Sequence, residues 1–134
     1  MQVNPYLSFD GQCEAAFKFY ESCLGGRIGA MLSYGETPMA EHMPPEARGR
    51  IAHARLMLGN QVLMGGDAPP GRYEPSKGMS VTLGIEGADE AERVFQALAE
   101  GGTVTMPLQK TFWALRFGML VDRFGTPFMI NCEK

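Results

Sequence analysis

The sequence has few of the features that mark a disulfide scaffold, a metal site or a membrane protein. Its 134 residues include three cysteines, two histidines and one tryptophan. An odd number of cysteines without a CxxC pair indicates neither a disulfide framework nor zinc-ligand spacing. No apolar run approaches the ~20 residues of a membrane span, and MQVNPYLSF at the N-terminus lacks the basic and apolar regions of a signal peptide. We therefore expect a cytoplasmic protein with reduced, buried or half-buried thiols and no membrane partner.

Charge is also sparse. Charged residues make up 20% of the chain, the net charge is -3, and the basic residues form no run. Such a chain lacks the positive surface that binds nucleic acid or anionic lipid, so neither partner is expected. Its length and its 45% hydrophobic content suit one ordinary domain with a real core.

One stretch of the sequence occurs twice. Residues 6 to 26, YLSFDGQCEAAFKFYESCLGG, align without a gap with residues 82 to 102, TLGIEGADEAERVFQALAEGG. The identical pairs are Leu7/Leu83, Gly11/Gly87, Glu14/Glu90, Ala15/Ala91, Phe19/Phe95, Gly25/Gly101 and Gly26/Gly102. Because several of these fall at turns and helix ends, the repeat indicates a duplicated strand and helix unit.

Each copy of the repeat opens a series of predicted elements. Residues 3 to 9 alternate as in a strand, and a helix is predicted for residues 12 to 24, capped by Asp10 and ended by Gly25-Gly26. The apolar stripe of this helix is predicted to be Ala16, Phe19, Tyr20, Cys23 and Leu24. The rest of the first half is predicted as a strand at 27 to 34, a loop at 35 to 49 with a helical turn begun by Pro45, and a hairpin of residues 50 to 58 and 61 to 65 across Gly59-Asn60.

The second half repeats this plan after a Pro/Gly-rich loop at residues 67 to 79. Its predicted elements are a strand at 80 to 86, a helix at 88 to 100 with Asp89 and Glu90 at its positive end, a strand at 103 to 108, and a hairpin of 115 to 122 and 126 to 132 around Arg123-Phe124-Gly125. Each half is thus predicted as strand, helix and three strands.

This plan resembles the vicinal-oxygen-chelate superfamily of glyoxalase I, extradiol dioxygenases and bleomycin- and fosfomycin-resistance proteins. The segments YLSFDGQCEAAFKFY, IAHARLMLGNQVLMGGD and TFWALRFGMLVDRFGTPFMINCE resemble its PhnB-like branch. The resemblance implies an α+β fold in which two repeated βαβββ modules, residues 1–67 and 78–134, form an open glyoxalase/bleomycin-resistance-like barrel within one domain, residues 1–134. It also implies a homodimer that binds a small molecule.

The PhnB-like branch is sometimes labelled after a demethylubiquinone methyltransferase. The sequence shows no glycine-rich strand-to-helix turn in a parallel sheet, which is the usual cradle for a nucleotide-like methyl donor. We therefore do not expect the label to describe the chemistry.

Metal-dependent relatives place one ligand on the first and one on the last strand of each unit. The resemblance puts these positions at Asn4, Met64, Ser80 and Met129. Hard divalent ions prefer carboxylate or imidazole ligands, whereas these residues offer an amide, a hydroxyl and two thioethers. We therefore expect no metal and no other cofactor.

Strand alternation extends the set of residues expected to face the ligand cavity. Tyr6 and Ser8 share a face with Asn4, and Thr82 shares one with Ser80. A two-residue turn at Gly59-Asn60 pairs Arg55 with Met64 and places His53 beside them. If the loop of the last hairpin has two or four residues, the side chains predicted to face the cavity are those of Arg116, Gly118, Leu120, Met129 and Asn131.

Two functions stay open on this pattern. The first is a metal-free protein that binds a small molecule, with an anionic group as the natural partner of the arginines. Its predicted ligand-binding residues are Asn4, Tyr6, Ser8, Arg55, Met64, Ser80, Thr82, Trp113, Arg116, Met129 and Asn131. The second is an enzyme of lyase, isomerase or transferase type with His53 as catalytic acid or base and with Arg55 and Arg116 as charge stabilisers.

The same residues also have structural interpretations that involve no ligand. The arginines can pair with loop carboxylates such as Glu36, Glu41 or Glu74, His53 can be a structural residue, and Trp113 can pack in the core or an interface. Met39, His42 and Met43 are interpreted as ordinary loop residues. Replacing His53 by alanine separates the two main readings, because it should leave binding within a few fold but reduce enzymatic turnover by roughly 100-fold or more.

Overall fold

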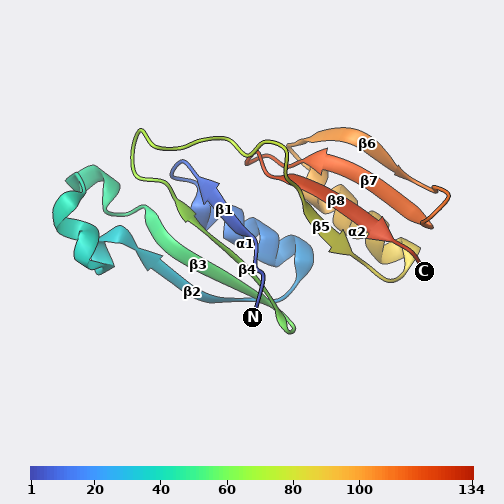
Figure 1. Ribbon diagram of the computed structural model, residues 1–134, viewed down its shortest axis with the longest axis horizontal. Helices are drawn as coiled ribbons and strands as arrows, with labels where there is room; N and C mark the ends of the chain where they lie inside the picture. Colours follow the sequence, from blue (N-terminus) through green and yellow to red (C-terminus); the bar gives the residue numbers. More distant parts are fainter. The chain divides into compact units, whose positions relative to one another are not determined.

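The computed structural model describes residues 1–134, which divide into two compact units, Met1–Pro75 (unit 1) and Ser76–Lys134 (unit 2). In each unit one α-helix packs on one face of a four-stranded mixed sheet (Figure 1). The strand orders β1-β4-β3-β2 and β5-β8-β7-β6 are equivalent. The predicted α+β fold of two βαβββ modules is therefore confirmed.

The helices and strands occur in the predicted order in both units. Unit 1 consists of β1 (Tyr6–Phe9), α1 (Cys13–Leu24), β2 (Arg27–Ser33), the 3-10 helices η1 (Tyr34–Glu36), η2 (Pro38–His42) and η3 (Pro45–Ala47), β3 (Ile51–Leu58) and β4 (Gln61–Asp67). Unit 2 consists of β5 (Val81–Gly84), α2 (Ala88–Ala99), β6 (Thr103–Gln109), β7 (Arg116–Val121) and β8 (Pro127–Cys132). Neither α-helix is long and apolar enough to cross a membrane.

The hairpin of β3 and β4 has the predicted register. Leu58 pairs with Gln61 across the two-residue turn, and Arg55 pairs with Met64. Strand β1 pairs in parallel with β4, so that Tyr6 lies opposite Met64. Because this register was deduced correctly, the predicted faces of both hairpin strands are also correct.

Helix α1 buries one stripe of side chains against the sheet of unit 1. The buried residues are Cys13, Ala16, Phe17, Tyr20 and Cys23. The ring of Phe17 meets those of Phe9 and Tyr20 edge-on, with ring centroids 6.2 and 5.9 Å apart. The predicted stripe is thus partly wrong, because Phe19 and Leu24 are only half-buried whereas Phe17 is fully buried.

The helix cap comes from a residue far away in the sequence. Asp10 was expected to cap α1, but the capping position is Gln12, and it has no side-chain cap bond. Asp67 at the end of β4 accepts the N–H groups of Gly11 and Cys13 through Oδ1, at 2.8 and 3.0 Å. Its Oδ2 accepts the N–H of Ile51 at 2.8 Å. Asp10 instead pairs with Arg50 at the surface.

The segment between β2 and β3 is more ordered than the predicted loop. The helical turn expected from Pro45 is present as η3, and two further 3-10 helices precede it. Tyr34, Met43 and Ala47 form a small buried cluster against Ala52. The Tyr34 hydroxyl donates to the Asp67 carbonyl at 2.7 Å, which ties this segment to the end of β4.

The last hairpin has a different loop from the one predicted. The N–H of Asp122 donates to the carbonyl of Thr126, and Gly125 has a φ of 90° and donates its N–H to the carbonyl of Asp122. These bonds enclose a three-residue loop with a glycine bulge, Arg123-Phe124-Gly125, rather than a loop of two or four residues. The change by one residue moves β7 by one position against β8.

This shift reverses the predicted face of β7. Met129 pairs with Met119, and Asn131 pairs with Phe117. The predicted inward position of Arg116, Gly118 and Leu120 is therefore wrong, since these residues share a face with the buried Phe128, Ile130 and Cys132 on the helix side. Arg116 donates from Nε to Oε1 of Glu92 on α2 at 3.1 Å.

All three cysteines are free and buried, as predicted. Burial, with smaller effects from the Asp67 and Glu14 carboxylates, raises the pKa of the Cys13 thiol from 9.0 to about 12. The pKa of the Cys13 thiol is therefore higher in the folded chain than in the unfolded chain. The contribution of the protonated thiol to the free energy of unfolding is complete below pH 9 and is lost as the pH rises toward 12.

We therefore expect the free energy of unfolding to fall between about pH 9 and pH 11 more steeply in the wild type than in Cys13→Ala, by up to about 1.4 kcal/mol per pH unit. Urea unfolding at several pH values measures both slopes. Titration of lysines and tyrosines contributes equally to the slopes of both proteins and cancels in the difference between them. Equal slopes would contradict a protonated, buried Cys13.

Candidate functional site

The face of the unit 1 sheet that points away from α1 brings together four predicted site residues. Tyr6, Met64 and Arg55 lie side by side on β1, β4 and β3, because Met64 pairs with both of the others. The rings of Tyr6 and His53 stack with their centroids 5.8 Å apart. Alternation in β1 buries Leu7 and Phe9 and leaves Tyr6 and Ser8 exposed. We call this surface the open face of unit 1.

Tyr6 is held in place by its hydroxyl. The hydroxyl donates to the carbonyl of Ala52 at 3.3 Å. A Cβ at Gly66 would lie 2.7 Å from the Tyr6 oxygen, so the glycine leaves the space that the hydroxyl occupies. Burial raises the pKa of the Tyr6 phenol, with smaller contributions from Cys13 and Tyr34. The phenol is therefore neutral at neutral pH. The sequence analysis did not identify Gly66 as the residue that leaves space for the Tyr6 hydroxyl.

Arg55 is a charged residue of the open face and lies next to Met64. Its side chain is exposed and forms no ion pair with the carboxylates of the chain. The expected alternative partners Glu36, Glu41 and Glu74 do not pair with it; Glu36 instead accepts from Ser33. A guanidinium beside two stacked rings and a thioether can bind an oxyanion by two hydrogen bonds.

Unit 2 has a corresponding open face with an aromatic character. Trp113 donates from Nε1 to Oδ1 of Asn131 at 3.2 Å, and its ring lies 5.1 Å from that of Phe117. Thr82 pairs with Met129, which in turn pairs with Met119. The structure thus groups four predicted residues, Trp113, Asn131, Thr82 and Met129. Phe117 and Met119 were missed because of the reversed face of β7.

Asn4 and Ser80 lie at equivalent positions of the two units, just before β1 and β5. Asn4 lies two residues before Tyr6, the partner of Met64, and Ser80 lies two residues before Thr82, the partner of Met129. Asn4 is half-buried and Ser80 is exposed. An amide, a hydroxyl and two thioethers do not fit a hard divalent ion. Among residues 1–134 no group of three His, Cys, Asp or Glu side chains is placed to hold a metal.

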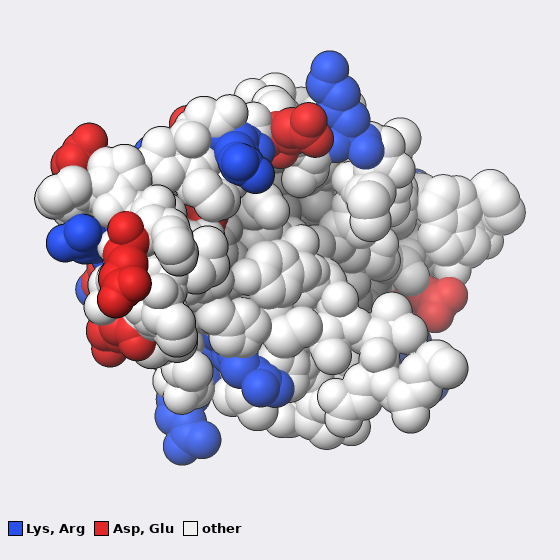
Figure 2. Space-filling view, turned by 60° about the vertical axis from the view of Figure 1, so that its left-hand side comes forward, with Lys and Arg blue, Asp and Glu red and all other residues white.

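The visible face in Figure 2 shows the charge distribution of the surface. Lysine and arginine side chains and aspartate and glutamate side chains are scattered among uncharged residues in this view. No continuous basic area appears on this face. Arg27 pairs with Met57 on β3 and is exposed, so it adds a second guanidinium to the open face of unit 1.

Comparisons with known proteins agree with the duplicated fold. A crystal structure of protein PA1353 from Pseudomonas aeruginosa is 48% identical, covers 99% of this chain and 98% of its own, and superposes with a TM-score of 0.91. A Bacillus cereus structure described as a putative 3-demethylubiquinone-9 3-methyltransferase, PhnB protein, is 27% identical over 98% of this chain and 99% of its own, with a TM-score of 0.81.

A third relative, Protein YjdN of Escherichia coli strain K12, is 36% identical over 144 residues, which cover 100% of this chain and 97% of the relative. At the level of the fold alone, a glyoxylase/bleomycin resistance protein/dioxygenase domain from Frankia sp. EAN1pec superposes with a TM-score of 0.64 at 13% identity, over 99% of this chain and 95% of its own. The last superposition shows that the chain has the fold of a glyoxalase/bleomycin-resistance domain. The chain belongs to the family described as 3-demethylubiquinone-9 3-methyltransferase, whose model matches residues 1–131.

Proposed function

We propose that the protein binds a small anionic molecule on the open face of unit 1 without a metal ion. The observation that supports this most directly is Arg55, an exposed guanidinium without an internal carboxylate partner, in one row with Met64 and Tyr6. Arginine holds carboxylate or phosphate oxygens by paired hydrogen bonds. A free guanidinium is therefore the group around which an anionic ligand is oriented.

The neighbours of Arg55 suit the remaining body of such a ligand. The stacked Tyr6 and His53 rings present an aromatic surface, and Met64 presents an adaptable apolar one. Ser8 adds an exposed hydroxyl on the same face, and Asn4 adds an amide at its edge. We propose these five residues as the ligand contacts that accompany Arg55.

On unit 2 we propose a second ligand-contacting surface. Trp113 already uses its N–H on Asn131, so the face of the indole ring is what it offers to a planar group. Thr82 and Met129 lie on the same face, and Ser80 lies just before it. Arg116 is not part of this proposal, because it faces α2 and pairs with Glu92.

Binding fits the geometry around His53 better than proton transfer does. The imidazole is stacked on Tyr6, and none of the ion pairs of the chain includes it. A general acid or base is usually oriented by such a partner. The enzymatic alternative rests on His53 and Arg55 alone once Arg116 is removed from it.

We also propose that the protein is a cytoplasmic homodimer. Support for the location comes from the three free, buried thiols, which suit a reducing compartment. Support for the dimer comes from the resemblance to the superfamily. Size-exclusion chromatography with light scattering tests the dimer, and a mass of one chain would contradict it.

Substitution of Arg55 by glutamine is expected to weaken anion binding at least about 10-fold, because the charge-assisted pair of hydrogen bonds is lost. Met57 lies two residues after Arg55 on β3 and therefore on the same face. Protein labelled with [methyl-13C]methionine reports binding on the open face through the Met57 and Met64 methyl groups. Malonate and phenyl phosphate serve as probes, titrated until the methyl shifts saturate.

Arg116→Gln is the matched control, because it makes the same chemical change on the opposite face of a sheet. It is expected to leave the probe affinity within about 2-fold, since its surface ion pair contributes little to the fold. The proposal fails if neither probe shifts the Met57 and Met64 methyl groups, or if the two arginine variants weaken binding equally.

A further inference from the structure

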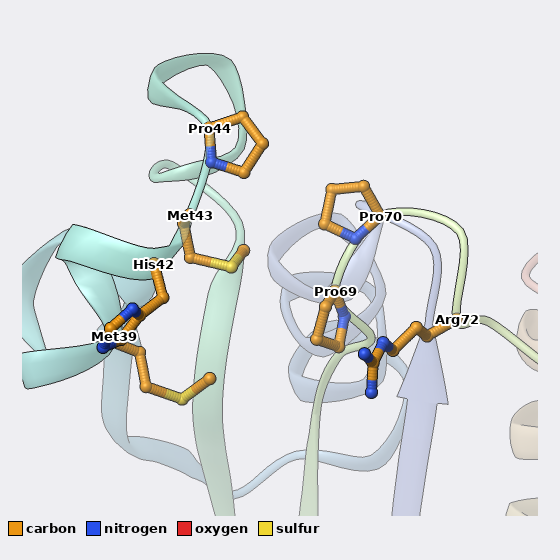
Figure 3. A pocket seen from close by; sticks show the side chains of 7 residues that line it. All are labelled: Met39, His42, Met43, Pro44, Pro69, Pro70 and Arg72. Atoms are coloured by element: carbon orange, nitrogen blue, oxygen red, sulfur yellow. The ribbon is translucent and has the colours of Figure 1, made fainter.

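A pocket of about 360 Å³ lies in unit 1 outside the proposed ligand contacts. It is lined by Met39, His42, Met43 and Pro44 from the segment around η2 and by Pro69, Pro70 and Arg72 from the segment after β4. Figure 3 shows the Met39 and Met43 side chains on one side and Pro69, Pro70 and Arg72 on the other. Its volume is in the usual range for small-molecule sites.

The lining combines an apolar wall with one permanent positive charge. Two thioethers and three prolines provide the apolar surface, and no aspartate or glutamate is among the lining residues. Arg72 forms no ion pair with the chain's carboxylates. In Figure 3 its guanidinium points back toward the space between the two walls. A guanidinium in a carboxylate-free, mainly apolar pocket selects for an anion with an apolar body.

The wall that contains Met39 and Met43 is fixed by bonds to the rest of its segment. The Thr37 hydroxyl oxygen accepts the N–H of Met39 at 3.2 Å, and Arg48 donates from Nε to the Ala40 carbonyl at 3.0 Å. Met43 is 6% exposed and packs with Tyr34 and Ala47. This wall is therefore formed before a ligand arrives.

The opposite wall is also tied to unit 1. Arg50 donates to the carbonyl of Ala68 at 3.1 Å, directly before Pro69 and Pro70. The N–H of Arg72 donates to the carbonyl of Pro69 at 3.0 Å and closes a turn. The two prolines have restricted backbone angles, so little freedom is lost when a ligand contacts them.

We propose that this pocket is a binding site for a small aromatic or alicyclic carboxylate. The carboxylate pairs with the Arg72 guanidinium, and the ring lies between the methionine thioethers and the prolines. His42 supplies a further hydrogen-bonding group at the lining. The site is independent of the proposed open-face function, because none of its lining residues belongs to the open face.

Benzoate tests the proposal, with benzamide as a neutral ligand of the same shape. In [methyl-13C]methionine protein, assigned with Met39→Leu and Met43→Leu, benzoate is expected to shift the Met39 and Met43 methyl resonances to saturation at millimolar concentrations or below. Arg72→Gln is expected to weaken this binding at least about 10-fold. Arg55→Gln, the matched control at the open face, is expected to change it by less than about 2-fold.

The same spectra keep the two sites apart. Met57 and Met64 report the open face, so loss of binding there leaves the Met39 and Met43 result intact, and the reverse holds as well. Unchanged resonances of the other methionines show that Arg72→Gln is folded. Equal shifts with benzamide, an unaltered affinity in Arg72→Gln, or no saturable shift of Met39 and Met43 would overturn the proposal.

Discussion

Replacing Asp67 with asparagine is expected to lower the free energy of unfolding by about 3 kcal/mol. The buried carboxylate accepts three backbone N–H groups, from Gly11, Cys13 and Ile51. Asparagine keeps one acceptor oxygen but places its NH2 group against an N–H that then has no partner. The change therefore removes charge-assisted bonds and leaves a buried donor unpaired, while it also loosens the start of α1.

Asp10→Asn is the matched control for Asp67. Its carboxylate is about half exposed, and its ion pair with Arg50 lies at the surface. We expect this variant to lose less than about 1 kcal/mol. Urea unfolding followed by circular dichroism measures both. If Asp10→Asn costs as much as Asp67→Asn, the local cap predicted from the sequence is the real one and the long-range cap is wrong.

Gly26→Ala is expected to destabilise the protein by about 3 kcal/mol or more. A Cβ at Gly26 would lie 2.4 Å from the backbone oxygen of Met57, which cannot move without disturbing β3. Gly26 also has a φ of 80°, where an alanine is strained. The same close approach recurs at Gly102, where a Cβ would lie 2.3 Å from the oxygen of Val121. The second glycine of both Gly-Gly pairs thus leaves space for a neighbouring strand.

Gly25→Ala separates the steric effect from the backbone effect. Gly25 has a φ of 77°, close to that of Gly26, but a Cβ there would meet nothing within 4 Å. We expect it to cost about 1–3 kcal/mol and less than Gly26→Ala, because only the strain of its backbone remains, which has a φ of 77° and a ψ of -156° and is adopted almost only by glycine. Thermal or urea unfolding of the two variants gives the difference. Similar losses in both would show that the turn at Gly26 and strand β3 can separate enough to admit a methyl group.

The two hairpins show which parts of the fold local sequence can predict. At Gly59-Asn60 the turn residues specify a two-residue loop, and the register of Arg55 against Met64 follows from counting outward. At Arg123-Phe124-Gly125 the correct loop has three residues, closed by the Asp122 backbone. A one-residue difference in loop length moves every side chain of β7 to the other face of the sheet, and for this reason the predicted side of Arg116 is wrong.

Long-range bonds account for the other differences. Asp10 and Asp67 are both aspartates, and only the tertiary pairing of β4 with β1 brings the second one to α1. The same limit applies to the pocket lined by Met39, Met43 and Arg72. Its two walls come from loops that are separated in the sequence and that have no periodic pattern, so composition alone led to their interpretation as ordinary loop residues.

Native mass spectrometry with elemental analysis, on protein purified without added metals or chelators, tests the central claim of metal-free anion binding. We expect no stoichiometric transition metal, and a small organic anion that copurifies with the wild type and with Arg116→Gln but is lost from Arg55→Gln. One tightly bound transition metal per chain would contradict the account. It would show that the donor set at Asn4, Met64, Ser80 and Met129 does not decide whether this protein uses a metal.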